Sequence, residues 1–560
     1  MIDRYNPSNS KSKPSPVIVI IKRVLEILLI VLAIFSITEV ITGGFKINLS
    51  FIKLSFTDLH KISIYLLFIF FIRLYISSVE KNDEFAVKVR KITSSQYFPL
   101  CLFITISTIF IVIKIHYHLT FMNWARDFSV YEYAFFNTLT GNFMYSPFLN
   151  KCYFAEHFSP ILLTALPFYA LIPSIYTLIV WQAILLAGAV IPAFLLSNTI
   201  WKDSISSTLF SVGLMTMAVF GYVLECDVHQ EAVYPLLFLT LVYALEKENK
   251  TLFTIGFLIM LTVKEDAPIY ACFFAISAIF YRRWWRVGIL TLLISVIYWF
   301  SVIYLLMPAL GARGYGPPQI LARWGQYGNS TGEISLWFLT HPIQVMKMMF
   351  RSEVLKFFPL FLFTSILSPW VLLAIPYLII HSTSNIEIQY NLTAYFGAPA
   401  ATLFAISSIY GIKNLSIWLS KIKIDAKKLI LLLAFSRTII NICQLHLIKI
   451  DKDTLVAENI LSRIPENASF SAAEHIFPHI RPHKEIYILP EIDNAEYIFI
   501  DTGLFSGVFT KTDAMITLNK QVLKGKYKVI DKGSNRFYLL KRTDEIKKTS
   551  DNKQLKFSIF

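Results

Sequence analysis

Long apolar segments recur along most of the chain, and short polar loops separate them. An α-helix needs about 20 apolar residues to cross the roughly 30 Å hydrocarbon core of a membrane. Segments close to this length include Val24–Thr42, Ile62–Val79, Tyr97–Ile113, Val287–Leu306 and Leu429–Leu447. The pattern therefore predicts an all-α polytopic membrane protein, with about 13 transmembrane helices once shorter segments are included.

The pattern changes after Ile450, where short stretches of alternating apolar and polar residues begin. Such alternation is typical of β-strands. The stretches Tyr527–Ile530 and Arg536–Leu540 are separated by a polar turn and predict a β-hairpin. We therefore expect three regions. They are residues 1–96 with a cytoplasmic N-terminus and two spans, residues 97–448 as the transmembrane core, and residues 449–560 as a small soluble α/β domain.

The amino-acid composition also indicates that the helical part lies in a lipid membrane. Apolar residues fill 55% of the 560 positions, and the mean hydropathy is +0.56, which is more than a soluble core needs. The formal net charge of +15 suggests nucleic acid at first sight, but the basic residues lie in short loops between apolar segments. Cytoplasmic loops of membrane proteins collect Lys and Arg, so we expect no nucleic-acid partner.

The distribution of Lys and Arg also predicts the orientation of the chain. Basic residues between Arg4 and Arg23 place the N-terminus in the cytoplasm. Residues 158–198 fit either two spans or one span at 175–197 preceded by a re-entrant segment. The second choice is the one that keeps the basic cluster Arg282–Arg286 inside, so we expect a single span there.

In this orientation, two large loops, 116–174 and 308–351, face outward, and the C-terminal domain is extracytoplasmic. Residues 251–281 must then contain two crossings that meet at Lys264-Glu265-Asp266, because one continuous span would place three charges in the middle of the hydrocarbon. We expect short or broken helices in this region, which proteins tolerate where the backbone lines a cavity.

Four groups of polar residues fall on the outer side in this topology. Charges near lipid are costly, so each group is a candidate functional site. Asp127 also opens an amphipathic stretch, where it is equally explained as a helix cap. The groups are Asp127 with Glu132, Glu156-His157, Asp227-x-His229-x-Glu231 and Lys264-Glu265-Asp266.

Two of these groups have a functional and a purely structural interpretation. The carboxylates and imidazole of Asp227, His229 and Glu231 are spaced to hold a divalent cation, the single cofactor that the pattern suggests, or they form a solvated loop. Lys264-Glu265-Asp266 either binds a substrate or contains an internal ion pair.

Basic residues and histidines elsewhere leave similar alternatives. Arg313 and Arg323 lie among glycines and aromatic residues in the second outer loop. They are candidates for holding phosphate or sugar, or they belong to a flexible loop without a ligand. The histidines of the C-terminal domain lack regular metal spacing, so we expect a surface role for His475, His479 and His483.

The order and spacing of the acidic motifs resemble those of a known family. The motifs are Asp127–Thr138 (DFSVYEYAFFNT), Glu156–Pro160 (EHFSP), Asp227–Ala232 (DVHQEA) and Val263–Ala267 (VKEDA). Together they resemble the prokaryotic membrane family known as domain of unknown function 2079, over most of the chain. This family is similar in layout to the GT-C superfamily, which are membrane glycosyltransferases that take sugars from polyprenyl-phosphate donors.

The resemblance implies a glycosyltransferase at the outer face of a prokaryotic cell membrane, with membrane lipid and a polyprenyl-phosphate-linked sugar as partners. Sugar transfer needs a base near the acceptor hydroxyl, a role that Asp127 would fill. The departing phosphate needs positive charge, which Lys264 or a divalent cation at the Asp227 group would supply. The other substrate-binding candidates are Glu156, His157, Glu265, Asp266, Arg313 and Arg323.

Two other functions remain open from the sequence. Charges within the membrane and broken helices also mark substrate pathways, so a transporter or flippase of a lipid-linked or polar substrate is an alternative. A non-catalytic membrane assembly protein, whose outer domain binds a partner, is the other.

Overall fold

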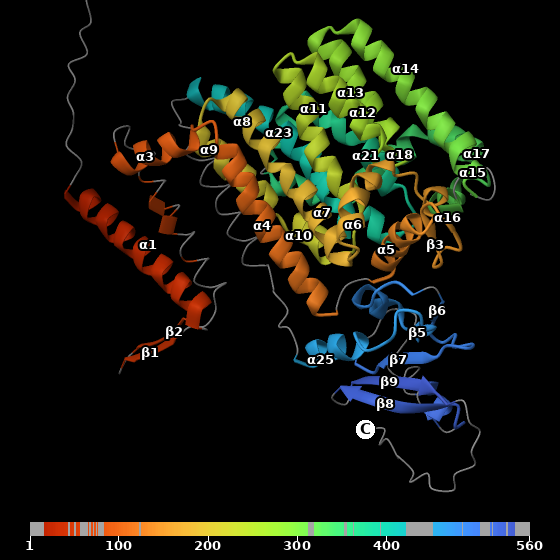
Figure 1. Cartoon of the computed structure of the whole chain (residues 1–560). Coiled ribbons are helices and arrows are strands. Elements are labelled where there is room, and N and C mark those ends of the chain that lie inside the picture. The colour runs from red at the N-terminus through yellow and green to blue at the C-terminus, as the bar shows by residue number, and fades with distance from the viewer. Residues whose placement is uncertain are drawn as a thin grey trace, which may run out of the picture.

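The structure is a computed structural model of the whole chain (Figure 1). It describes residues 16–42, 45–49, 52–56, scattered positions between 65 and 76, 83–121, 125–311, 318–421 and 452–543, the last two ranges with short gaps. Most of the described residues are helical, and a small sheet forms near the C-terminus.

Four helices among the described residues are long and apolar enough to cross a membrane. They are α4 (Phe98–Leu119), the run of α7 (Ile175–Gly188) and α8 (Val190–Trp201), the run from α14 (Trp285–Ser301) to Ala309, and α23 (Gly397–Lys421). A fifth crossing results if α9 (Ser204–Met215) and α10 (Ala218–Glu225), which are bent by 44°, form one span.

The predicted apolar segments agree with these helices where they can be compared. Tyr97–Ile113 largely coincides with α4, and Val287–Leu306 lies within the α14 run. Val24–Thr42 lies within α1 (Pro16–Thr42). Leu429–Leu447 lies outside the described residues, and so does most of Ile62–Val79. The count of about 13 spans therefore stays a prediction.

Two regions confirm local features that the charges predicted. Residues 158–174 form a 3-10 turn (Pro160–Thr164) and a six-residue helix, α6 (Leu166–Leu171), before the single long run of α7 and α8 begins. The helices α12 (Lys250–Leu261) and α13 (Ala267–Arg282) are short and are separated by residues 262–266. The charged triplet therefore lies in a turn between two helices.

The other helices of this part pack around these long ones. They are α3 (Glu84–Thr93), α5 (Ala125–Leu139), α11 (Tyr234–Glu246), α15 (Met307–Ala309), α16 (Pro318–Trp324), α17 (Thr331–Thr340), α18 (Pro342–Met349), α20 (Phe357–Leu360), α21 (Ile375–Ser382) and α22 (Glu387–Tyr390). Two small antiparallel pairs of strands accompany them: β1 (Phe45–Leu49) with β2 (Ile52–Phe56), and β3 (Tyr145–Ser146) with β4 (Lys151–Cys152).

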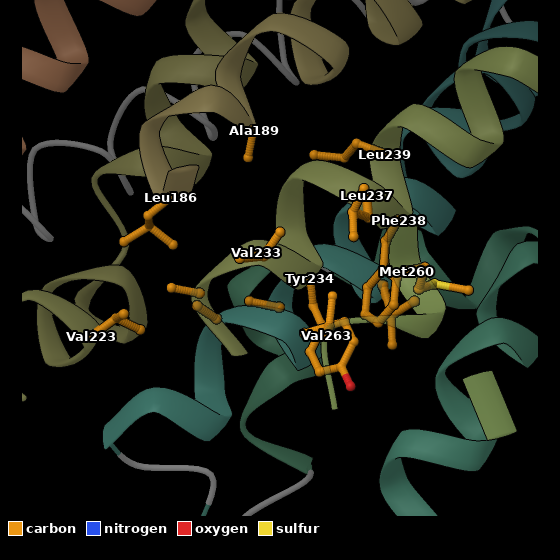
Figure 2. Close-up of a cluster of buried hydrophobic side chains, with 14 of the residues drawn as sticks. Leu186, Ala189, Val223, Val233, Tyr234, Leu237, Phe238, Leu239, Met260 and Val263 are labelled. Carbon is orange, nitrogen blue, oxygen red and sulfur yellow. The ribbon is translucent and has the colours of Figure 1, made fainter. Parts of the chain in front are cut away.

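One continuous apolar core holds the helical part together. Figure 2 shows side chains of four helices meeting, with Leu186 of α7, Val223 of α10, Phe238 of α11 and Met260 of α12 all buried. By contrast, α4 and α14 leave apolar side chains such as Ile104 and Ile297 exposed. Exposed apolar faces on long helices are what a lipid environment requires.

The C-terminal strands form a five-stranded mixed sheet in the order β6-β5-β7-β9-β8. The predicted hairpin is confirmed as the antiparallel pair β8 (Tyr527–Gly533) and β9 (Phe537–Arg542). The strand β5 (Phe470–Ala472) pairs in parallel with both β6 (Ile486–Ile488) and β7 (Tyr497–Asp501). The helix α25 (Lys452–Leu461) contacts β8.

The sheet region docks on the ends of α4 and α5, as Figure 1 shows in blue below the orange helices. The Tyr133 hydroxyl of α5 accepts a hydrogen bond from the backbone N–H of His483 at 3.0 Å. The ring of His479 stacks between His118 of α4 and Phe121, with centroid distances of 4.2 and 3.5 Å. The expected surface role of the histidines is therefore wrong, because His475, His479 and His483 are buried.

Candidate functional site

Asp227 fixes the beginning of α5, where Asp127 lies in the first turn. One carboxylate oxygen of Asp227, Oδ2, accepts hydrogen bonds from the backbone N–H groups of Asp127 at 3.0 Å and Phe128 at 3.4 Å. A side-chain oxygen at a helix N-terminus satisfies N–H groups that have no partner within the helix. The cap formed by Asp227 therefore fixes the position of Asp127 relative to the segment 227–231.

The other oxygen of Asp227, Oδ1, is buried and has no hydrogen-bond partner among the described residues. Burial, followed by the negative charge of Asp127, raises the pKa of Asp227 well above its usual range. The two acids are therefore not equivalent. Asp227 is enclosed and resists ionisation, whereas 49% of the Asp127 side chain is exposed.

His229 is the side chain that approaches the Asp127 carboxylate. Its Nε2 lies 3.5 Å from Asp127 Oδ2, and its ring stacks on Tyr395 at a centroid distance of 3.5 Å. Burial lowers the pKa of His229 to about 4. At neutral pH the imidazole is therefore uncharged, and it faces the carboxylate as a neutral hydrogen-bonding group.

Glu231 and Lys264 form a buried ion pair between the short helix at Gln230–Val233 and the turn after α12. Burial alone would raise the pKa of Glu231 and lower that of Lys264. Their mutual attraction outweighs burial, so the pKa of Glu231 is lowered and that of Lys264 is raised. Both groups therefore stay charged.

The next two residues of the turn are engaged as well. Glu265 contacts the ring of His157, with Oε1 2.8 Å from Nδ1, and its Oε2 accepts the backbone N–H of Phe158 at 3.2 Å. Burial would raise the pKa of Glu265, but His157 and Lys264 bring it to about 2. Asp266 accepts hydrogen bonds from the hydroxyls of Tyr234 at 2.6 Å and Tyr270 at 2.9 Å.

The structure thus brings two of the four predicted groups completely into one network, and one member of each of the other two. Asp127 belongs to it, whereas Glu132 lies on another side of α5 and lines a separate cavity. His157 belongs to it, but its neighbour Glu156 pairs with Lys151 instead. Arg323 lies within electrostatic range of Lys264, whose protonation it opposes. The backbone carbonyl of Arg323 accepts the N–H of Asn385 at 2.8 Å, which anchors this segment to residues after α21. Arg313 lies outside the described residues.

The predicted divalent-cation site is not assembled in this arrangement. Asp227 caps α5, His229 faces Asp127, and Glu231 binds Lys264, so the three side chains do not share a centre. Among the residues that the structure describes, no group of three or more His, Cys, Asp or Glu side chains is arranged to hold a metal ion.

Two side chains that hold the backbone of residues 226–229 were not predicted from the sequence. Lys114 of α4 is fully buried and donates to the carbonyl of Cys226 at 2.6 Å, and Gln182 of α7 donates to the carbonyls of Asp227 and His229. Lys114 is the one Lys, Arg, Asp or Glu of α4, and Gln182 is the one amide side chain of α7. Their isolation in these apolar helices was the available signal, since a polar group in a membrane helix requires a partner.

One of the comparisons with known proteins shows the family of the chain. A family model described as "Predicted membrane protein (DUF2079)" matches residues 117–537. No curated protein matches the sequence. Among solved structures, ArnT from Cupriavidus metallidurans bound to undecaprenyl phosphate is 9% identical, with a TM-score of 0.48 over 80% of this chain and 99% of ArnT. Its apo form is also 9% identical, with a TM-score of 0.43 over 77% and 97%. Because both TM-scores are below 0.5, these similarities carry no weight in the functional argument.

Proposed function

This chain belongs to the DUF2079 family of predicted membrane proteins, and we propose that it is a GT-C-like membrane glycosyltransferase. It would transfer a sugar from a polyprenyl-phosphate donor at the outer face of the cell membrane. The observation that carries the proposal is the half-exposed carboxylate of Asp127, which stands at a helix start capped by Asp227, beside the buried pairs Glu231–Lys264 and Glu265–His157.

Asp127 has the features that a general base needs. Its backbone is held by Asp227, and its half-exposed carboxylate is open to an acceptor hydroxyl. The imidazole that faces this carboxylate, His229, is neutral at pH 7 and so does not neutralise its charge. A positioned carboxylate that takes the proton of the acceptor in the transition state typically accelerates such a step by about 10²- to 10⁴-fold.

In this proposal, Arg323 and Lys264 supply the positive charge for the departing lipid phosphate. Arg323 is partly exposed and lies in the segment anchored by Asn385, so it is the group that would contact the phosphate. Lys264 is buried and bound to Glu231, so it would act through its field and not by contact. A fixed cation that meets the charge where it develops stabilises the transition state without reorganisation.

The test uses purified protein and radiolabelled polyprenyl-phosphate sugars, with extracted membrane glycolipids as acceptors. Asp127→Asn should reduce transfer by about 100-fold or more while the protein remains folded. The matched control is Asp531→Asn, which makes the same substitution at the surface ion pair with Arg463, and it should retain transfer. Unchanged transfer in Asp127→Asn would remove the proposed base. Accumulation of substrate in vesicles without covalent transfer would instead identify a transporter.

A further inference from the structure

A cavity of about 590 Å³ lies where the C-terminal region docks on the helical part. Its walls come from α4, α5, the beginning of α7, α25 and the segment 478–482. Its size is within the range of sites that hold small molecules. The residues that matter for its chemistry are His118, Glu132, Phe136, Tyr176, Glu458 and His479.

This cavity is distinct from the Asp127 site, although both use α5. Asp127 and Glu132 are five positions apart, which places them roughly 140° apart around the helix. Asp127 faces His229, whereas Glu132 lines the cavity on the side of the C-terminal region. A ligand in the cavity would therefore not occupy the position of the sugar acceptor.

Glu132 is the feature that points to a ligand. It is 3% exposed, and its Oε2 has no hydrogen-bond partner among the described residues. The carboxyl does accept a hydrogen bond from the backbone N–H of Ile175 at the start of α7, so part of its role is to cap that helix. The remaining oxygen is unsatisfied, which is unfavourable for a buried acceptor. A ligand with a hydrogen-bond donor would remove this cost.

The charges of the wall favour a cationic donor over a neutral one. Glu132 and Glu458 both line the interior, and burial raises the pKa of each carboxyl group, so a positive charge on the ligand is what would keep them ionised. The one cationic side chain among the described lining residues, Arg481, is bound to Glu466 at the exposed rim. Burial and the nearby His475 keep the pKa of His479 well below its usual range, so this ring adds no positive charge at pH 7.

The residues that line the cavity do not suit a metal ion as the ligand. Calcium and magnesium require about six or more oxygen ligands at close range. Among the described residues, no group of three or more His, Cys, Asp or Glu side chains meets even the minimal arrangement for a metal. The rings of Phe136 and Tyr176 instead offer the apolar and π surfaces on which an organic cation packs.

We propose that this cavity binds a small organic cation with a primary ammonium group, whose nitrogen donates to the carboxyl group of Glu132 and whose carbon chain packs on Phe136 and Tyr176. The ligand thereby bridges the helical part and the C-terminal region.

Calorimetric titration of the full-length protein in detergent micelles tests the proposal with 1,4-diaminobutane, its neutral counterpart 1,4-butanediol, and calcium chloride. The diamine should bind, and the diol and calcium should not. Glu132→Gln keeps the shape of the side chain and should weaken diamine binding by about 10- to 100-fold, because a hydrogen bond to a charged group is lost.

The controls separate folding and function from binding. Glu491→Gln changes an exposed carboxylate outside the cavity and should leave the affinity unchanged. If Glu132→Gln does not fold, Glu458→Gln, whose side chain is 32% exposed, decides the question by the same loss of affinity. Asp127→Asn should bind the diamine normally, so failure of the proposed transferase activity would not affect this result. Equal binding of the diol, binding of calcium alone, or unchanged affinity in both cavity variants would overturn the proposal.

Discussion

Replacing Lys264 by methionine should be one of the most destabilising single substitutions in the helical part. The side chains of Lys264 and Glu231 are only 3% and 4% exposed, and each is the direct ionic partner of the other. Removing the ammonium leaves a buried carboxylate whose other oxygen, Oε2, already has no hydrogen-bond partner among the described residues. Breaking a buried ion pair in this way costs about 3–5 kcal/mol.

The double variant Lys264→Met/Glu231→Gln should recover much of this loss. The double variant removes both charges, so no unpaired charge is left in the interior. Replacing a complete buried ion pair by uncharged side chains often changes the free energy of unfolding very little. Unfolding in mixed micelles, followed for wild type, both single variants and the double variant, gives the coupling between the two sites. Single variants as stable as wild type, or a double variant whose loss is the sum of the two, would refute the reasoning.

The same four proteins decide what Lys264 does in sugar transfer. If the double variant regains both stability and activity, Lys264 and Glu231 form a structural pair that holds the turn after α12. If it regains stability without activity, the charge of Lys264 acts on the substrate, as its place beside Arg323 suggests.

Two further predictions concern other parts of the fold. Burial would raise the pKa of Asp501, but His475 and Arg536 lower it from 3.8 to about 2, so this carboxylate contributes about 2 kcal/mol to folding at neutral pH. This contribution is present above pH 3.8 and is lost as the pH falls toward 2. Protection of β7 and β9 against hydrogen exchange, corrected for intrinsic rates, should decline over that window in wild type but change little in Asp501→Asn; equal decline in both would contradict it. Gly411→Ala should lower the unfolding temperature, since its Cβ would lie 1.8 Å from the carbonyl oxygen of Thr364 and overpacking costs about 1–3 kcal/mol. Its control, Gly221→Ala, meets nothing within 4 Å and should be neutral or stabilising; an equal effect of the two substitutions would contradict the close packing of α23.

Several features of this protein followed from sequence because they depend on local chemistry. Hydropathy identified the apolar segments of α4 and α14, since lipid is the solvent that such exposed faces require. Alternation and turn residues identified the β8–β9 hairpin. The cost of charge in hydrocarbon placed Lys264 in a turn between two short helices.

The partners of the charged residues were decided only by the tertiary structure. The sequence does not show that Glu231 pairs with Lys264, or that Glu156 pairs with Lys151 while His157 contacts Glu265. Nor does it show that the described residues hold no set of three metal ligands. It also misplaced the buried histidines, because their burial depends on how the C-terminal region docks on α4 and α5. Apart from Glu156 and Lys151, these contacts join segments about 30 to 350 positions apart. They are set by distances of a few ångströms between those segments, and no local pattern encodes such distances. Hydropathy alone indicated a membrane protein. The tertiary packing of the helices decided that Asp127 is the half-exposed acid of the network.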